Sequence, residues 1–286
     1  MPWVRVAVVG HTEWVQFVKL DRVPKAGEIV HAADAWEEVG GGGAVAAVQL
    51  RKLAGEADFF TALSEDDVGL AALARLEALG VTPHVAWRAA PQRRAVTHLD
   101  AEGERTITII GERLAPKGAD ALAWERLRDT EAVYFTAGDL GALRHARAAR
   151  VLVATPRARD ALLAGKVPLD ALVGSADDEG ERLPDGALRP PPRLEVATQG
   201  VQGGRYVEAE GRSGSWEAAT LPGEIADAYG CGDSFAAGLT YGLAIGRDVD
   251  YALELAARCG AACLTGQGPY EGQLELGRDD RGSTPA

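Results

Sequence analysis

The chain has 286 residues, of which 47% are hydrophobic, 25% are charged and only 6% are aromatic. This composition is typical of a globular protein with a large core. The formal net charge is −12 and the sequence has no dense run of lysine and arginine, so nucleic acid and anionic membrane surfaces are poor candidates for partners. No window approaches the roughly 18 apolar residues that a membrane span requires.

The cysteine content gives a first indication of the compartment. The chain has three cysteines, Cys231, Cys259 and Cys263. This number is small and odd, which argues against a disulfide framework and favours a reducing compartment. No histidine or third cysteine stands at metal-ligand spacing from Cys259 and Cys263, so both are interpreted as core residues. The N-terminal segment lacks the length and the cleavage pattern of a signal peptide, and we expect a cytoplasmic protein.

Strand and helix signals alternate in the first part of the chain. The short β-rich run Val4–Val9 predicts a buried first strand that ends at Gly10. The expected elements that follow are an exposed strand, a helix, a strand, a helix and a strand, at Ile29–Trp36, Ala44–Leu53, Asp58–Ala62, Val68–Leu79 and Thr82–Trp87.

Two half-exposed β segments interrupt this alternation. Arg94–Asp100 and Arg105–Ile110, joined by a polar turn, have the pattern of a hairpin with Thr, Arg and His on one face. Such a pattern is typical of a sheet that is covered on one side only. The segments at about 11–36 and 87–112 are therefore expected to pair in space as a small lid.

The second part of the chain alternates again, and we find no internal repeat or linker. The polar tail Arg278–Ala286 is expected to be frayed. Together these signals predict one α/β domain over residues 1–286, with a doubly wound, mostly parallel sheet and a small β-sheet lid. The expected strands are Ala132–Thr136, Ala149–Ala154, Ala171–Gly174, Leu194–Thr198, Arg205–Glu208 and Gly214–Ala219, and the expected helices are Asp233–Leu243 and Val249–Leu264.

The most informative segment is Asp227–Gly238, which reads Asp-Ala-Tyr-Gly-Cys-Gly-Asp-Ser-Phe-Ala-Ala-Gly. Its glycines permit a tight turn whose backbone N–H groups point one way, and the helix that follows adds unpaired donors and a positive dipole end. Gly230, Cys231 and Gly232 are thus candidates for an anion hole that holds a transferring phosphoryl group. Asp233 can accept a proton from a nearby hydroxyl. The alternative is a simple helix cap after a tight turn.

This segment closely resembles the second signature of the ribokinase-like PfkB carbohydrate kinase family, Asp-Thr-x-Gly-Ala-Gly-Asp-x-Phe-x-x-Gly. Every specified position agrees except Ala228, which replaces Thr, and Cys231, which replaces Ala. The resemblance extends from Val4 to about Gly268. It implies an in-line transfer of the γ-phosphate of ATP to a substrate hydroxyl, with Asp233 as the base.

The N-terminal part carries two further resemblances. Val23–Glu28 is similar to the lid turn of the family, and Gly40–Ala47 resembles its first signature, Gly-Gly-x-x-x-Asn-x-Ala. The second resemblance implies that Gly41 and Gly42 let a polyol approach the backbone, while Val45 stands in place of the Asn. Because no apolar strand precedes this glycine run, a dinucleotide-binding fingerprint, and with it a dehydrogenase, is a poor interpretation.

Three segments resemble the nucleotide and cation sites of the family. Thr198–Gly203 is similar to the Thr-x-Gly-x-x-Gly loop that contacts the ATP phosphates, which assigns Thr198, Gly200 and Gly203 to the nucleotide. Ala176–Glu179 takes the place of Asn-x-x-Glu, so the resemblance implies that Glu179 helps to organise Mg²⁺. Asp227 is similar to a residue that helps to place a monovalent cation. The sequence Gly266-Gln267-Gly268 departs from the usual Arg-containing loop and puts that cation in doubt. Adenine is expected between the Thr198 region and the helix around Cys259.

The acceptor is not plain ribose on this reading. Glu13, Val15 and Val45 stand where ribose kinases have polar sugar ligands, and sugar hydroxyls without partners bind poorly. Glu13 remains a substrate candidate. Arg94 and His98 are weaker ones, because an exposed strand face is the better explanation for each.

The leading interpretation is therefore a small-molecule kinase for a sugar or related polyol. A nucleoside kinase of the same family is the alternative, with Val15 and Val45 facing a base. A third interpretation is a non-catalytic ligand-binding relative. The resemblance also implies a possible homodimer through the lid.

Overall fold

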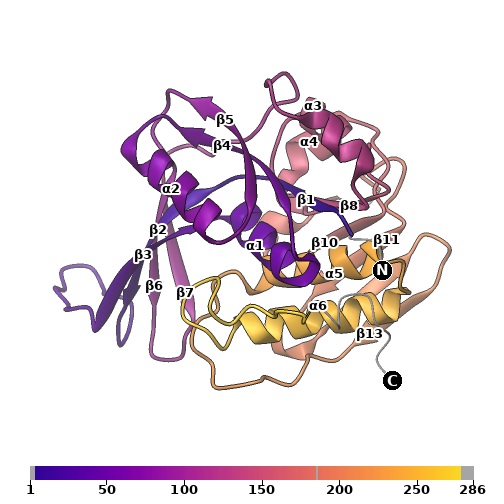
Figure 1. Cartoon of the computed structure of the whole chain (residues 1–286). Coiled ribbons are helices and arrows are strands. Elements are labelled where there is room, and N and C mark those ends of the chain that lie inside the picture. Colours follow the sequence, from indigo (N-terminus) through magenta and orange to yellow (C-terminus); the bar gives the residue numbers. More distant parts are fainter. Residues whose placement is uncertain (1–3, 185, 278–286) are drawn as a thin grey trace.

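The computed structural model describes residues 4–184 and 186–277, in which two β-sheets of unequal size carry the helices (Figure 1). Within these residues the larger sheet has nine strands, in the order β13-β12-β11-β10-β9-β8-β1-β4-β5. The strands from β11 to β5 pair in parallel, and β12 and β13 add an antiparallel edge. Their bounds are β1 Val6–Val9, β4 Asp58–Ser64, β5 Thr82–Arg88, β8 Ala132–Phe135, β9 Val151–Ala154, β10 Ala171–Ser175, β11 Leu194–Thr198, β12 Gly204–Glu208 and β13 Ser213–Trp216.

Helices cover both faces of this sheet. The central strands β1, β8 and β9 consist of buried Val, Ala, Leu, Tyr and Phe, as expected for parallel strands that are shielded on both sides. One apolar cluster joins the sheet to four helices, and a second cluster joins its other face to two shorter ones. The first group is α1 Gly42–Ala54, α2 Asp67–Ala78, α5 Cys231–Ala244 and α6 Val249–Cys263, and the second is α3 Leu140–Ala146 and α4 Arg159–Ala164.

Close contact between α5 and α6 fixes the helix that carries the signature segment. A methyl group on Gly238 would lie 2.8 Å from the Cα atom of Ala256, and one on Gly242 would lie 2.7 Å from the Cα atom of Ala252. Only glycine lets the two backbones approach this far. The packing of α5 against α6 therefore fixes the direction of the helix that begins at the signature turn.

The smaller sheet has the strand order β3-β2-β6-β7 and forms the expected lid. Its strands come from two excursions of the chain, one between β1 and α1 and one after β5. The inner face is apolar and alternates with polar positions along β2 and β6. The bounds are β2 Glu13–Lys19, β3 Asp34–Gly40, β6 Arg94–Leu99 and β7 Arg105–Ile110.

The fold class predicted from the sequence is confirmed, but several element boundaries differ; the strand expected at Gly214–Ala219, for example, already ends at Trp216. The exposed strand expected at Ile29–Trp36 begins only at Asp34 and runs to Gly40, because it pairs with the whole of β2 and stacks Trp36 on Phe17 with ring centroids 5.0 Å apart. Trp87 belongs to β5 of the larger sheet rather than to the lid. Helix α5 starts at Cys231, two residues before the expected start.

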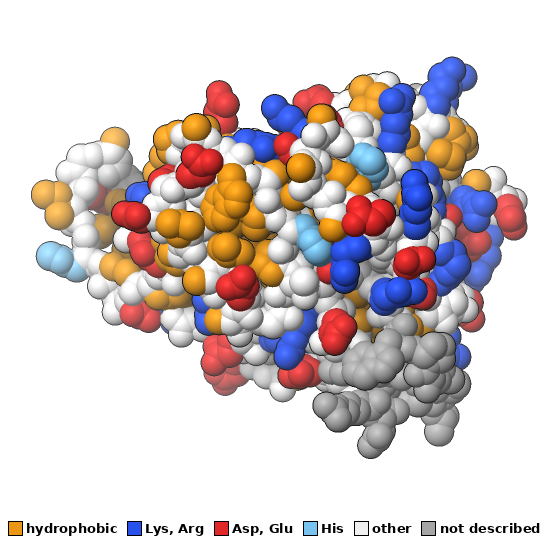
Figure 2. All heavy atoms as spheres, turned by 45° about the horizontal axis from the view of Figure 1, so that its top comes forward, with side chains coloured by type: hydrophobic (Ala, Val, Ile, Leu, Met, Phe, Trp, Pro, Cys, Tyr) orange, Lys and Arg blue, Asp and Glu red, His pale blue; other side chains and the backbone are white. Residues whose placement is uncertain are grey.

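None of the helices within residues 4–184 and 186–277 is long and apolar enough to cross a membrane. On the face seen in Figure 2, acidic and basic side chains are interspersed, with no continuous basic surface. The tail Arg278–Ala286, which is expected to be frayed, lies outside the described residues.

Candidate active site

A cleft of about 670 Å³ opens at the carboxyl ends of the parallel strands, between the larger sheet, the lid and the start of α5. This is where doubly wound sheets bind their ligands. The strand ends contribute Thr136, Thr155, Ser175 and Thr198 to its wall, and the lid contributes Ile107 and Ile109.

The glycine turn at the start of α5 lines this cleft through Gly230 and Gly232. Gly230 has φ 81°, and a methyl group there would lie 2.8 Å from Cγ1 of Val45, so the position requires glycine. The first intrahelical hydrogen bond is donated by Ser234 N to Gly230 O (2.9 Å). The N–H groups of Cys231, Gly232 and Asp233 precede it and have no intrahelical acceptor. The turn therefore offers an anion site beside a carboxylate.

Asp233 lies in the first turn of α5 and lines the cleft next to these amides. Burial raises the pKa of Asp233 to about 7; the negative charge of Glu181 adds to this, and the positive charge of Arg157 opposes it. A base whose pKa lies near neutral pH is partly ionised and still basic enough to take a proton.

The first signature meets the second through Tyr229. Gly41, with φ 86°, donates its N–H to the hydroxyl of Tyr229 (3.0 Å), which directly precedes the glycine turn. Gly41 and Gly42 line the cleft as expected. Val45 differs from the expectation of a substrate contact, because its side chain is fully buried beneath Gly230 and does not line the cleft. It supports the turn from below.

Glu13 lines the cleft but is already paired. Its Oε1 lies 2.7 Å from Nε of Arg93 and 3.3 Å from Nε2 of His11. Burial alone raises the pKa of Glu13, but the hydrogen bond with His11 and the charges of Arg93 and Arg113 leave it below its usual value. Glu13 is thus an ionised carboxylate with two arginines nearby.

Four arginines in this cleft were missed by the sequence analysis, which singled out Arg94 instead. Arg94 is exposed, and neither it nor His98 lines the cleft. The missed arginines are Arg93, Arg105, Arg113 and Arg157.

Position in the chain could have suggested two of them. The four places where the chain passes between the larger sheet and the lid all contribute to the cleft, through His11, Gly41, Arg93 and Arg113. The residues at such crossings lie at the hinge between lid and sheet, so they converge whatever the lid strands themselves contain.

Several buried polar atoms near Glu13 have no hydrogen-bond partner among the described residues. Within the described residues, His11 Nδ1, Arg113 Nε and Thr136 Oγ1 are buried and make no hydrogen bond. Buried polar groups rarely stay unsatisfied in a native protein unless a ligand or water completes them. The three side chains line the cleft through their other atoms, so this part of its wall is polar.

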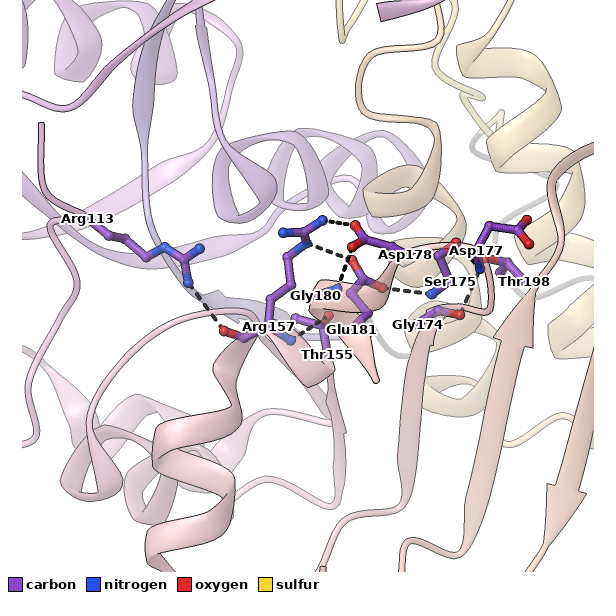
Figure 3. Close-up of polar contacts among 10 residues, drawn as sticks. All are labelled: Arg113, Thr155, Arg157, Gly174, Ser175, Asp177, Asp178, Gly180, Glu181 and Thr198. Atoms are coloured by element: carbon purple, nitrogen blue, oxygen red, sulfur yellow. Dashed lines mark hydrogen bonds and ion pairs between the residues drawn. The ribbon is translucent and has the colours of Figure 1, made fainter. Parts of the chain in front are cut away.

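The side of the cleft at which the sequence predicts the nucleotide is built from β10, β11 and the turns that follow them. Thr198 lines the cleft, with its hydroxyl 3.4 Å from Gly174 O, whereas Gly200 and Gly203 form the turn behind it at φ 53° and 77°. Glu179 lines the cleft and is exposed. Glu181 is the acidic residue of this segment that points inward, since its Oε2 accepts Ser175 N (2.7 Å; Figure 3).

A second hollow, of about 370 Å³, lies between β13 and α6. Trp216, Ala219, Leu253 and Ala257 give it apolar walls suited to a flat base. Cys259 itself is fully buried in the core, so this hollow lies on the more exposed part of the same helix.

Asp227 is completely buried and ties two backbone segments together. Its Oδ1 accepts Tyr229 N (2.7 Å) and its Oδ2 accepts Gly268 N (3.0 Å). Burial raises the pKa of Asp227. Both oxygens thus hold the glycine turn against the loop at Gly268, and a monovalent cation would have to share them with these N–H groups.

The acidic residues near Glu179 suit indirect rather than direct binding of a Mg²⁺ ion. No group of three or more His, Cys, Asp or Glu side chains in residues 4–184 and 186–277 is arranged to hold a metal. Mg²⁺ keeps most of its waters and takes only one or two carboxylates besides nucleotide phosphates. The cleft-lining Asp177 and Glu179 fit that indirect mode.

Comparisons with known proteins agree on the family. The model of the pfkB family of carbohydrate kinases matches residues 4–167 and 169–275. The chain belongs to the PfkB family. It is therefore an enzyme, a kinase of the ribokinase-like fold, and the family uses ATP as its phosphoryl donor.

Relatives of this PfkB kinase span nearly its whole length. An ATP-dependent ribose-1-phosphate kinase of Halopiger xanaduensis is 27% identical over 281 residues, covering 90% of this chain and 91% of the relative. A ribokinase structure from Thermotoga maritima has a TM-score of 0.74 at 19% identity and covers 97% of each chain. A nucleoside kinase structure from Methanocaldococcus jannaschii has a TM-score of 0.70 at 15% identity and covers 94% of each chain. Both structures share the fold.

Proposed function

We propose that this PfkB kinase transfers the γ-phosphate of ATP to a hydroxyl of a sugar that already carries a phosphate group. The observation that carries the proposal is that Arg93 pairs with the single carboxylate of Glu13 and Arg113 lies near enough to lower the pKa of that carboxylate, in a part of the cleft that His11 and Thr136 also line.

Electrostatics favours a negatively charged acceptor at this end of the cleft. Burial lowers the pKa of the Arg113 guanidinium, and the positive charge of Arg93 lowers it further. Two like charges in a half-buried place repel each other, and one carboxylate balances only one of them. A phosphate group would supply the missing negative charge and accept N–H donors of the guanidinium groups.

The Halopiger xanaduensis relative supports the same acceptor class, because ribose 1-phosphate is a pentose that carries a phosphate. The nucleoside alternative loses its main argument. Val15 and Val45, which were expected to face a base, are both fully buried. A neutral nucleoside would also bind poorly beside Arg93 and Arg113, because its sugar hydroxyls cannot compensate the positive charge that a phosphate group would compensate.

The reaction follows from the residues around Asp233. The acceptor hydroxyl lies between Asp233 and the γ-phosphate, its oxygen attacks the γ-phosphorus, and its proton passes to Asp233 Oδ1 or Oδ2. The bond between the γ-phosphorus and the β–γ bridging oxygen breaks, and ADP leaves. The N–H groups of Cys231 and Gly232 stabilise the charge on the transferring group. Closure of the lid excludes water, which would otherwise be phosphorylated instead.

ATP would lie along the nucleotide side, with its phosphates near Thr198 and the turn at Gly200 and Gly203, and its base in the hollow at Trp216 and Ala257. Asp177 and Glu179 would hold hydrated Mg²⁺, which neutralises phosphate charge when it is bound. Asp227 keeps its structural place behind the turn, and assays in K⁺, Na⁺ and Tris salts would measure any need for a monovalent cation.

The decisive experiment is an acceptor panel with the purified protein. ADP release and ³¹P NMR of the product would be measured with ribose 1-phosphate, ribose 5-phosphate, ribose, a cyclitol, a sugar acid and several nucleosides. We expect a sugar phosphate to give the highest kcat/KM, by at least tenfold over its unphosphorylated form. Asp233→Asn serves as the control against a contaminating kinase. A preference for nucleosides or neutral sugars would contradict the acceptor class, and no turnover with any acceptor would favour the non-catalytic interpretation.

A further inference from the structure

We infer that Arg157 is a further catalytic residue of this chain, whose guanidinium contacts the transferring phosphoryl group and stabilises its negative charge. The inference rests on the proposed kinase reaction, but not on the identity of the acceptor. Neither family signature includes this position.

The backbone places Arg157 at the reacting end of the sheet. It lies in a short 3-10 turn, Pro156–Ala158, that directly follows β9 and is capped by the hydroxyl of Thr155, which accepts Arg157 N (3.4 Å). Thr155 and Arg157 both line the cleft. Figure 3 shows the side chain of Arg157 extended between Arg113 on one side and the acidic segment at Asp178 and Glu181 on the other.

Two carboxylates hold the guanidinium in place. Its Nε lies 2.7 Å from Oε1 of Glu181, and its Nη2 pairs with Asp178. Each carboxylate is itself fixed by the backbone, because Glu181 Oε2 accepts Ser175 N (2.7 Å) and Asp178 Oδ1 accepts Gly180 N (2.8 Å). A cationic group with this support is oriented before the substrates arrive, which is what transition-state stabilisation requires.

The guanidinium keeps free donors and access to solvent. The Arg157 side chain is 47% exposed, although it has two ion pairs. Within the described part of the chain, no hydrogen bond or ion pair uses its Nη1. Arginine has five N–H donors and can bind two phosphate oxygens at once, so donors remain for a phosphoryl group.

The charged side chains of the cleft differ in the carboxyl group whose pKa they shift most. Among the positive charges, Arg157 lowers the pKa of Asp233 most, and among the negative charges, Glu181 raises it most. Arg93 and Arg113 act instead on Glu13 and His11, at the acceptor end. Arg157 is also connected to the nucleotide side of the cleft. Its guanidinium bonds to Glu181, Glu181 accepts the N–H of Ser175, and Ser175 pairs with Thr198 across strands β10 and β11. Arg157 therefore lies where Asp233 and the ATP phosphates meet.

The role in the reaction is electrostatic. As the acceptor oxygen bonds to the γ-phosphorus and the bond to the bridging oxygen breaks, negative charge spreads over the three equatorial oxygens and the leaving β-phosphate. Arg157 donates N–H bonds to these oxygens, and the proton of the acceptor hydroxyl goes to Asp233. In other phosphoryl-transfer enzymes an arginine in this role accounts for about 10³ or more in kcat.

A structural role for Arg157 predicts a different result. Ion pairs between half-exposed side chains contribute roughly 0–1 kcal/mol to stability. Loss of Arg157 without a catalytic role would therefore change stability little; because its charge also lowers the pKa of Asp233, the loss would shift the pH profile upward but leave the rate at high pH nearly unchanged. The two roles can be separated by kinetics at constant stability.

The experiment compares Arg157→Met and Arg157→Lys with the wild type and with Arg159→Met. Arg159 is the matched control, because it lies two residues away on α4, is exposed and does not line the cleft. Among the described residues its side chain makes one hydrogen bond, to Arg182 O (3.2 Å). Single-turnover rate, KM for ATP, thermal stability and the affinity for ADP with aluminium fluoride and acceptor, a transition-state analogue, are measured for each protein.

We expect Arg157→Met to lower the single-turnover rate by about 10² to 10³, with the analogue affinity falling in parallel and KM for ATP changing by less than about threefold. Arg157→Lys should recover part of the rate, and Arg159→Met should behave as wild type. Arg157→Ala should regain activity when guanidinium ion is added at millimolar concentration.

A rate for Arg157→Met within threefold of wild type, or a loss seen only in KM for ATP, would overturn the inference. A wild type that is active on neutral sugars would contradict the acceptor class alone, since the Arg157 variants can be tested with that sugar. A wild type that phosphorylates no acceptor would overturn both proposals.

Discussion

Gly42 and Asp233 face each other so closely that a methyl group on Gly42 would lie 2.6 Å from Oδ1 of Asp233. Gly42 is the first residue of α1 and Asp233 lies in the first turn of α5, so the two signatures meet at the carboxylate of the proposed base. The absence of a side chain on Gly42 leaves the room in which an acceptor hydroxyl can approach that carboxylate.

Gly42→Ala should therefore displace the Asp233 carboxylate and lower kcat/KM by about tenfold to a hundredfold, because a shift of about 1 Å in a catalytic group can cost that much. The backbone of Gly42 does not have a positive φ, so the fold should tolerate alanine. Steady-state kinetics and thermal melting of the variant would check this. Normal activity would mean that Asp233 is not held at the place where it acts.

The glycine turn offers a comparison between two neighbouring positions. A methyl group on Gly232 meets nothing within 4 Å, because it would project into the open cleft. Gly232→Ala should fold with unchanged thermal stability, yet lower kcat by about 10² by blocking the phosphoryl group from the amides, as loss of an oxyanion donor does in other enzymes.

Gly230→Ala is the matched contrast. At φ 81° and with Val45 Cγ1 2.8 Å away, alanine should destabilise the protein as well as inactivate it. Melting temperature and kcat, measured on both variants, would separate the two effects. Equal loss of stability in both variants would contradict an anion site at Gly232.

Activity should rise with pH through about 7. Burial raises the pKa of Asp233 to about 7, and only the ionised form can accept a proton from the acceptor. Below that pH, kcat/KM should fall by about tenfold per pH unit, as expected for one essential base. A rate that is flat between pH 5 and 7 would argue against Asp233 as that base. Asp233→Asn should lose a factor of about 10² or more in kcat while still binding ATP.

The same carboxyl group should make stability depend on pH. Its pKa in the folded protein lies above the ordinary value of 3.8, so the folded state binds more protons than the unfolded state between these values. Stability therefore falls as pH rises from about 4 to about 7. Asp233→Asn should melt several degrees above wild type at pH 8, and this difference should vanish near pH 4. A constant difference at all pH values would contradict the raised pKa.

Arg113→Met tests the acceptor end of the cleft. Loss of this charge should lower kcat/KM for a sugar phosphate by about 10² or more, because a charge-assisted bond to a phosphate is removed. For the unphosphorylated sugar, kcat/KM should change by less than about threefold, because this acceptor has no phosphate group that could pair with Arg113. A parallel loss with both acceptors would place the phosphate elsewhere.

Sequence-local features were the most predictable part of this protein. Gly230 and Gly232 could be recognised because two glycines at fixed spacing before Asp233 indicate a tight turn with exposed amides, and Gly230 has the positive φ that such a turn requires. The parallel strands β1, β8 and β9 were recognisable from continuous apolar runs. The strand at Asp34–Gly40 was misplaced, because its limits depend on the pairing with β2 rather than on its own residues.

Side chains that act together across the fold were not predictable in this way. Glu179 was singled out from its register, whereas the structure turns Glu181 inward onto Arg157 and Ser175. Arg93 was passed over in favour of Arg94, its neighbour in sequence, because only the path of the chain from sheet to lid decides which of the two faces the cleft.

The sequence by itself determined the alternation of strands and helices, the glycine turn and the position of the proposed base beside it. These depend on periodicity and on backbone conformation, which neighbouring residues encode. The tertiary structure alone decided which charges meet, namely Arg93 and Arg113 at Glu13, and Arg157 at Glu181. The order of strands in the two sheets sets these distances, and electrostatic interaction depends on distance in space rather than along the chain.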